Sequence, residues 1–157
     1  MLRTDRKPLS VFLMNRYIRW RVRREFHAVK LWGDAGLFED AATYPLVMFS
    51  THTHWWDAFL AVQIFERHRI EYFVMMEEKN LRKFPFFRRV GVFGVDLDSE
   101  AGRRAGLLYA ARLLRRAEHG RRRVLLIFPH GRLLRPGEPW PAFQPGVEAL
   151  VRMAGRG

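Results

Sequence analysis

His52 and Asp57 are the residues in this sequence whose types and spacing could do acid–base chemistry. A carboxylate on one ring nitrogen of a histidine fixes the tautomer and leaves the other nitrogen free to accept a proton. Such a pair is a general base that could activate a hydroxyl. The same spacing also fits an Asp that caps a helix beside an unrelated loop histidine, so both interpretations stay open at this point.

Two elements are predicted to position this pair. An apolar run at residues 45–49 is typical of a buried strand, and residues 58–65 are predicted to form a helix. His52 would then emerge just past the carboxyl end of the strand, and Asp57 would open the helix. The chain between them can fold back, so that the carboxylate meets the imidazole.

The rest of the chain predicts strands that alternate with helices. Strands are expected at 26–32, 46–50, 70–76, 92–97 and 124–128, and helices at 8–24, 101–118 and 146–153. This alternation indicates an α/β fold. We expect a single domain over residues 1–157, with a mixed, mostly parallel sheet flanked by helices. Ligands of such sheets bind beyond the carboxyl ends of the strands, where His52 and His130 both fall.

Two further motif blocks follow the one at Ser50–Asp57. The first runs from Lys79 through Phe84-Pro85-Phe86-Phe87 to Gly94-Val95-Asp96, and the second is Phe128-Pro129-His130-Gly131. In order and spacing the three blocks resemble the first three motifs of the PlsC-like glycerolipid acyltransferases, over about residues 26–154. That family includes lysophosphatidate and glycerol-3-phosphate acyltransferases. Its fourth block would follow the helix at 146–153, so we expect that this chain lacks the C-terminal part of the family fold.

The resemblance implies a transfer of a fatty acyl group to a hydroxyl of a lysophospholipid or a related lipid. The hydroxyl would give its proton to His52 as it attacks an acyl thioester, either acyl-CoA or acyl-carrier protein, while Asp57 holds the imidazole. No acyl-enzyme, cofactor or metal is expected, which agrees with the absence of Cys and of a Gly-x-Ser-x-Gly motif. Expected substrate contacts are Lys79, Arg82, Phe128, Pro129, His130, Gly131 and Arg132.

Some positions depart from the family pattern. Thr51 stands where the family often has Asn, and His54 stands close to its usual Ser. Leu97 occupies the position of an Arg, and His130 replaces the Glu of Phe-Pro-Glu-Gly. In the family, that Arg and that Glu are associated with holding the phosphate and glycerol of the acceptor. We therefore expect lysophosphatidate to be a mediocre acceptor and another lipid hydroxyl to be preferred.

The composition limits the compartment and the partners. A net charge of +12 predicts an anionic partner such as nucleic acid, a phospholipid surface or a phosphate-bearing substrate, although abundant Arg can also reflect a GC-rich genome. The absence of Cys excludes disulfides and a thiolate nucleophile and fits a reducing compartment. No run reaches the ~18 apolar residues of a spanning helix. We expect a cytoplasmic protein that is peripheral at the inner face of the membrane.

The N-terminal segment, residues 1–24, is predicted to contain a basic amphipathic helix that begins near Pro8. One stripe of this helix is apolar, and a second carries arginines with aromatic residues near it. The apolar stripe contains Val11, Met14, Ile18 and Val22. This helix could lie in a membrane interface, or it could dock on the core with solvated arginines, and both roles are compatible.

Other aromatic residues flank the predicted site. Phe84, Phe86 and Phe87 could border an acyl chain, but we expect at least two of them to pack in the core. Trp55 and Trp56 could lie at a lipid-facing mouth or be half-buried structural residues.

Two other functions remain as alternatives. A metal-dependent hydrolase could use His52, His54, Asp57 and His130 as ligands. A non-catalytic basic module could bind a membrane or nucleic acid through the arginines at 103–104, 112–116 and 121–123. No nucleic-acid-binding motif is present, so we expect no nucleic-acid partner. The sequence does not indicate an oligomeric state.

Overall fold

The computed structural model describes residues 1–34, 36, 38, 45–115, 123–135, 137–139, 141–142 and 146–154. The end of the helix predicted at 101–118 and the arginines at 116, 121 and 122 lie outside these residues.

Four strands in the described part of the chain form one parallel sheet with the order β1-β4-β2-β3. They are β1 (Leu46–Phe49), β2 (Glu71–Glu77), β3 (Val92–Val95) and β4 (Arg123–Ile127). Alternating strands and helices fold into such sheets, whose strands are apolar on both faces. The α/β prediction is confirmed, and these four strands lie where the sequence predicted them, with small differences at their ends.

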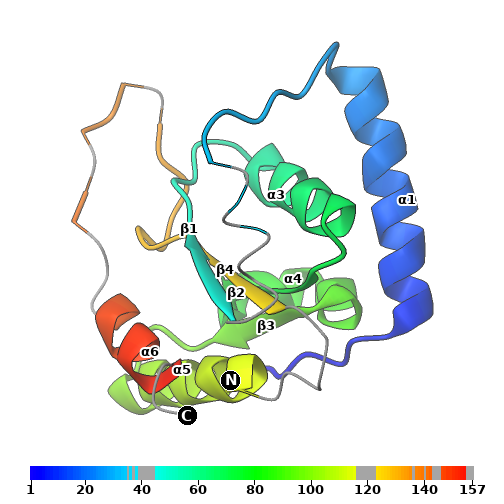
Figure 1. Ribbon diagram of the computed structural model, residues 1–157. Coiled ribbons are helices and arrows are strands. Elements are labelled where there is room, and N and C mark those ends of the chain that lie inside the picture. Colours follow the sequence, from blue (N-terminus) through cyan, green and yellow to red (C-terminus); the bar gives the residue numbers. More distant parts are fainter. Residues whose placement is uncertain are drawn as a thin grey trace.

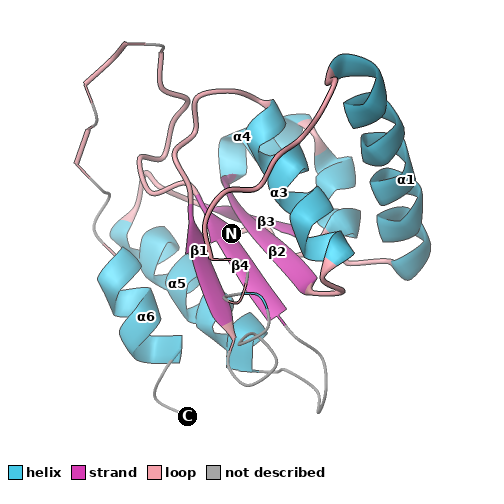
Figure 2. Ribbon diagram, turned by 45° about the horizontal axis from the view of Figure 1, so that its top comes forward, coloured by secondary structure: helices cyan, strands magenta, loops and turns pink. Residues whose placement is uncertain are grey.

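Helices cover both faces of the sheet (Figures 1 and 2). On one face, α1 (Pro8–Glu25) and α3 (Trp56–Arg67) pack with the side chains of Tyr72 and Val74. On the other, α5 (Glu100–Arg115) and α6 (Val147–Ala154) pack around Phe73. Because successive residues of β2 point to opposite faces, this strand contributes to both parts of the core.

The N-terminal helix α1 begins at Pro8, as predicted, because a proline at the first helical position lacks only an amide that the helix would leave unpaired. Its predicted apolar stripe faces the core, with Val11 and Ile18 buried. Asn15 lies in the same stripe and accepts a hydrogen bond of 2.9 Å from the buried hydroxyl of Tyr72. Before the helix, Leu2 pairs antiparallel with Gly94 at the edge of the sheet.

The prediction of a strand at residues 26–32 is wrong, because this segment has no regular secondary structure. Its alternation of apolar and polar residues matches a strand, but alternation does not supply a neighbouring strand with which to pair. The segment instead continues from the end of α1 as irregular chain. Its first ring, that of Phe26, lies edge-on to the ring of Trp56, with a centroid distance of 5.1 Å. Val29, Leu31 and Trp32 are exposed, Trp32 at 85%.

Two short helices, α4 (Glu78–Lys83) and η1 (Pro85–Val90), connect β2 to β3. The expectation that at least two of the three phenylalanines here pack in the core is wrong. Phe84 and Phe86 are 57% and 45% exposed, and only Phe87 packs against the core. The brief η1 helix turns these two rings outward as the chain crosses from one strand to the next. Among the described residues, no helix has the length and apolar character to cross a membrane.

Candidate functional site

The pairing of β1 with β4 brings two predicted motifs together at the carboxyl edge of the sheet. Phe49 at the end of β1 lies in register with Ile127 at the end of β4, and the Ser50 amide donates to the Ile127 carbonyl at 3.1 Å. His52 therefore follows within two residues of the last ladder contact, and Phe128 follows the neighbouring strand directly.

The contact expected between His52 and Asp57 is present. Nδ1 of His52 lies 3.0 Å from Oδ2 of Asp57, and the same oxygen accepts the backbone amides of Thr53 and His54, each at 2.8 Å. Asp57 is in the first turn of α3, where the positive end of the helix favours a carboxylate. The N-cap of α3 is Trp55, so Asp57 is not merely a capping residue beside an unrelated histidine.

The other sides of His52 are held by the segment that follows β4. The ring of Phe128 stacks on the imidazole with a centroid distance of 4.1 Å and an interplanar angle of 22°. The Leu134 amide donates to the His52 carbonyl at 2.6 Å. Because a carboxylate only accepts, Nδ1 carries the proton toward Asp57. Nε2, which has no hydrogen-bond partner in the described part of the chain, is the nitrogen that a substrate could use.

His54 has a different role from the one that the metal-site alternative needs. Its Nδ1 accepts the Trp56 amide at 3.3 Å and so faces the start of α3. Nowhere in the described ranges do three His, Cys, Asp or Glu side chains come together as metal ligands. The set of His52, His54, Asp57 and His130 is therefore not assembled as one metal centre.

The predicted substrate contacts after β4 are buried, occupy a turn or pair with a residue of the same segment. Pro129 and His130 are buried, His130 to 4% exposure, and Gly131 has a φ of 70°, which favours glycine. Arg132 is on the surface and forms an ion pair with Glu138. The hydrogen bond from Arg132 lowers the pKa of Glu138 to about 2. In this structure Arg132 therefore stabilises the segment after β4, to which it belongs, by pairing with Glu138.

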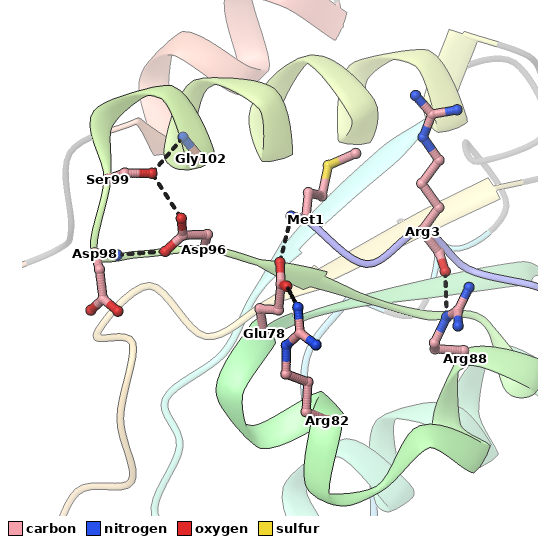
Figure 3. Close-up of polar contacts among 9 residues, drawn as sticks. All are labelled: Met1, Arg3, Glu78, Arg82, Arg88, Asp96, Asp98, Ser99 and Gly102. Atoms are coloured by element: carbon pink, nitrogen blue, oxygen red, sulfur yellow. Dashed lines mark hydrogen bonds and ion pairs between the residues drawn. The ribbon is translucent and has the colours of Figure 1, made fainter.

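Lys79 and Arg82 form a second group, at the carboxyl ends of β2 and β3. They line a hollow with four carboxylates: Glu77, Glu78, Asp96 and Asp98. Lys79 pairs with Asp98 at 2.7 Å. Arg82 pairs with Glu78 at 2.6 Å, as Figure 3 shows. The Asp98 hydrogen bond raises the pKa of Lys79. Both cationic side chains thus already form ion pairs with carboxylates. The hollow is lined by four carboxylates and two cationic side chains.

Sequence reasoning missed the acidic side of this hollow. Glu78 is buried and also receives the N-terminal ammonium of Met1 (Figure 3). Asp96 accepts the Ser99 hydroxyl and the Asp98 amide, which lowers its pKa and shapes the entry to α5. A signal for these acids was available, because each comes within three residues of the end of a predicted strand, where ligands of parallel sheets bind.

The predicted residues therefore divide into two sets. In the first set, His52 contacts both Asp57 and Phe128, and the predicted residues 129–132 follow Phe128 directly in the chain. In the second set, Lys79 and Arg82 lie beyond β4, at the ends of β2 and β3. At the usual strand spacing, β1 and β2 are about 10 Å apart.

Comparison with family models identifies a protein family for most of the chain. The family model described as Acyltransferase matches residues 37–156, which contain both sets of predicted site residues. Searches of curated proteins and of solved structures returned no match.

Proposed function

The chain belongs to the Acyltransferase family, and from this premise we propose that it transfers a fatty acyl group from an acyl thioester to a lipid hydroxyl. The thioester would be acyl-CoA or acyl-carrier protein, and the acceptor a lysophospholipid or a related lipid. The observation that carries the proposal is the His52–Asp57 contact at the carboxyl edge of the sheet. It leaves one ring nitrogen, Nε2, free for an acceptor hydroxyl.

The proposed reaction is a direct transfer. The acceptor hydroxyl donates a hydrogen bond to Nε2 of His52, its oxygen attacks the thioester carbonyl, and the proton moves to Nε2. Asp57 stabilises the imidazolium that forms. When the tetrahedral intermediate collapses, the C–S bond breaks and the thiolate takes the proton from His52, which restores the base. No cofactor takes part in these steps.

The mechanism is tested by replacing the base. Donors of both kinds would be offered with a panel of lysolipids and lipid alcohols, and the products identified by mass spectrometry. We expect His52→Ala to lower turnover by about 10²–10⁴-fold, the usual contribution of a positioned base. His27→Ala, an exposed histidine on the segment after α1, is the matched control. A folded His52→Ala protein with near-normal turnover would overturn the mechanism.

We also propose that lysophosphatidate is a mediocre acceptor and that another lipid hydroxyl is preferred. The proposal is supported by the hollow beside β2 and β3, where Lys79 and Arg82 are paired and carboxylates are in excess. A phosphate placed there would meet like charges, which disfavour its binding. Leu97, at the position of the family's Arg, adds no base to this hollow.

Acceptor choice is tested by restoring the family's residues. Leu97 is partly exposed, so Leu97→Arg should fold, whereas His130→Glu places a carboxylate at a buried position. We expect Leu97→Arg to raise turnover on lysophosphatidate relative to other lysolipids, and Leu108→Arg on the outer side of α5 to leave the ratio unchanged. Wild-type protein that already prefers lysophosphatidate, with no gain from either Leu97→Arg or His130→Glu, would contradict the proposal.

Peripheral membrane binding through α1 is the proposed route to lipid. The side of α1 that faces away from the core carries large exposed side chains: Leu9, Phe12, Leu13, Tyr17 and Trp20. Arginines at 16, 19, 23 and 24 are exposed beside them, and Arg24 lies over the Trp20 ring at 4.9 Å. A helix with aromatic residues and arginines on one side suits an anionic lipid interface.

Point variants test this surface better than deletion of the helix, because α1 also supplies Val11 and Ile18 to the core. We expect sedimentation with anionic vesicles to exceed that with neutral vesicles and to weaken with salt. Phe12→Ser should reduce it, and Leu108→Ser on α5 should not. Equal binding to both vesicle types at low salt, or an unaffected Phe12→Ser variant, would refute this surface.

A further inference from the structure

The His52 imidazole is held by contacts on more than one side, and only one of them comes from Asp57. Phe128 covers a face of the ring at 4.1 Å, nearly parallel to it. From this geometry we infer that Phe128 is a positioning residue, which keeps the plane of His52 turned so that Nε2 meets the acceptor hydroxyl. This inference rests on the proposed role of His52 as the base.

A second contact is needed because a single hydrogen bond does not fix a ring. The Asp57 bond holds Nδ1 but permits rotation about the line that joins the two residues, and the terminal torsion of histidine is broad. Rotation about that line would swing Nε2 away from the substrate. A flat aromatic contact opposes such rotation, since the two rings would lose their overlap.

Phe128 is well placed for this role because its backbone is fixed by the sheet. It directly follows β4, whose last residue lies in register with the last residue of β1. Farther along the same segment, the Leu134 amide holds the His52 carbonyl. The sheet and the segment after β4 thus hold the backbones of both stacked residues.

The inference gives Phe128 a different part from the substrate contact that the sequence predicted. A residue that binds substrate chiefly changes KM when it is replaced, whereas one that orients the base in the reacting complex changes kcat. The two roles can therefore be separated by steady-state kinetics. The side chain is partly buried, packs against the apolar core and stacks on the imidazole, which is why we favour the positioning role.

The experiment compares Phe128→Leu and Phe128→Tyr in the full chain, with Tyr109→Leu on α5 as an aromatic-to-leucine control. Release of the donor thiol is followed with a thiol reagent, which meets no background because the protein has no Cys. We expect Phe128→Leu to lower kcat about fivefold to tenfold with KM changed less than twofold. Phe128→Tyr, which keeps the stacked ring, should stay within twofold of wild type.

Other outcomes overturn the inference. A Phe128→Leu variant that changes only KM, or a Phe128→Tyr variant that loses as much kcat as Phe128→Leu, excludes a positioning role. If Phe128→Leu does not fold, NMR of the wild-type protein tests the stacking of Phe128 on His52. Stacking requires the His52 ring protons, assigned by their loss in His52→Ala, to be shifted upfield, and unshifted resonances refute it. Failure of His52→Ala to affect turnover would instead defeat the proposed function, so the two failures are distinguishable.

Discussion

Replacement of Asp57 by Asn separates the charge of this residue from its hydrogen bonds. One oxygen, Oδ2, accepts Nδ1 of His52 and the amides of Thr53 and His54. An Asn can place its carbonyl oxygen at the same point and keep all three bonds. The flipped amide is disfavoured because its NH₂ group would face two backbone donors. Asp57→Asn therefore removes the negative charge and leaves the geometry of the loop in place.

The size of the effect follows from the distance and the exposure of the pair. Two unit charges 4 Å apart interact by about 4 kcal/mol at an effective dielectric constant of 20 and by about 1 kcal/mol in water. The side chains of His52 and Asp57 are 25% and 20% exposed, so the interaction lies between these limits. Taking about 2 kcal/mol for the imidazolium–carboxylate attraction, and about 1.4 kcal/mol for each tenfold, kcat should fall about 30-fold.

The assay is the thiol-release rate at saturating substrate, with Glu148→Gln on α6 as a carboxylate-to-amide control that is exposed and remote from the site. Unfolding in urea must be measured in parallel. Loss of the charge in the first turn of α3 should lower the unfolding free energy by about 1 kcal/mol or less. An Asp57→Asn protein that is folded and keeps more than half of the wild-type kcat would show that the carboxylate does not assist His52.

Three further predictions concern the frame that carries the site. Gly106→Ala would place a Cβ 2.6 Å from both methyl groups of Val95 and should lower the unfolding free energy by about 1–3 kcal/mol; a loss below about 0.5 kcal/mol in urea denaturation would contradict this packing. Asn15→Leu leaves the buried Tyr72 hydroxyl without its acceptor and should cost about 1–3 kcal/mol, much of which the double variant with Tyr72→Phe should recover; purely additive losses would argue against the hydrogen bond. Burial raises the pKa of Tyr72 from 10.0 to about 12, so the fold favours the neutral phenol, and the unfolding free energy should fall by roughly 2 kcal/mol between pH 10 and 12; Tyr72→Phe should lack this part of the decline, and an identical decline in both proteins would contradict it.

The sheet could be predicted from sequence because each of its strands is a short apolar run between turn-forming residues. Residues 70–76, for example, are rich in aromatic and β-branched side chains and form most of β2. Residues 26–32 carry an equally good alternation, but in the described part of the chain no strand lies beside them to complete a ladder. The alternation describes one segment at a time and says nothing about its partner. The order of the strands, in which β4 lies between β1 and β2, was not predicted for the same reason.

The site was predictable where it is local in sequence. His52 and Asp57 are five positions apart on one strand-to-helix connection, so their contact follows from the two elements alone. The stack of Phe128 on His52 depends on the adjacency of β1 and β4, which the sequence did not reveal. The pairing of Lys79 with Asp98 likewise needs β2 and β3 side by side. A lysine written in a sequence looks the same whether it awaits a phosphate or already contacts a carboxylate.

The distribution of charge allows binding to an anionic membrane and choice of the lipid acceptor to be tested separately. The protein carries a net charge of +12, yet the hollow at the ends of β2 and β3 has more acids than bases, so the positive surplus lies elsewhere, in part on the exposed arginines of α1. Salt screens exposed charges and should weaken recruitment to anionic vesicles. If the carboxylates of the hollow repel a phosphate as proposed, salt should screen this repulsion, because the side chains of Lys79 and Asp98 are 65% exposed. Turnover on lysophosphatidate should then rise with salt relative to turnover on other acceptors dispersed in neutral detergent. If recruitment and this relative turnover both fall as salt rises, a single electrostatic surface governs recruitment and acceptor choice, and the acidic hollow does not select the acceptor.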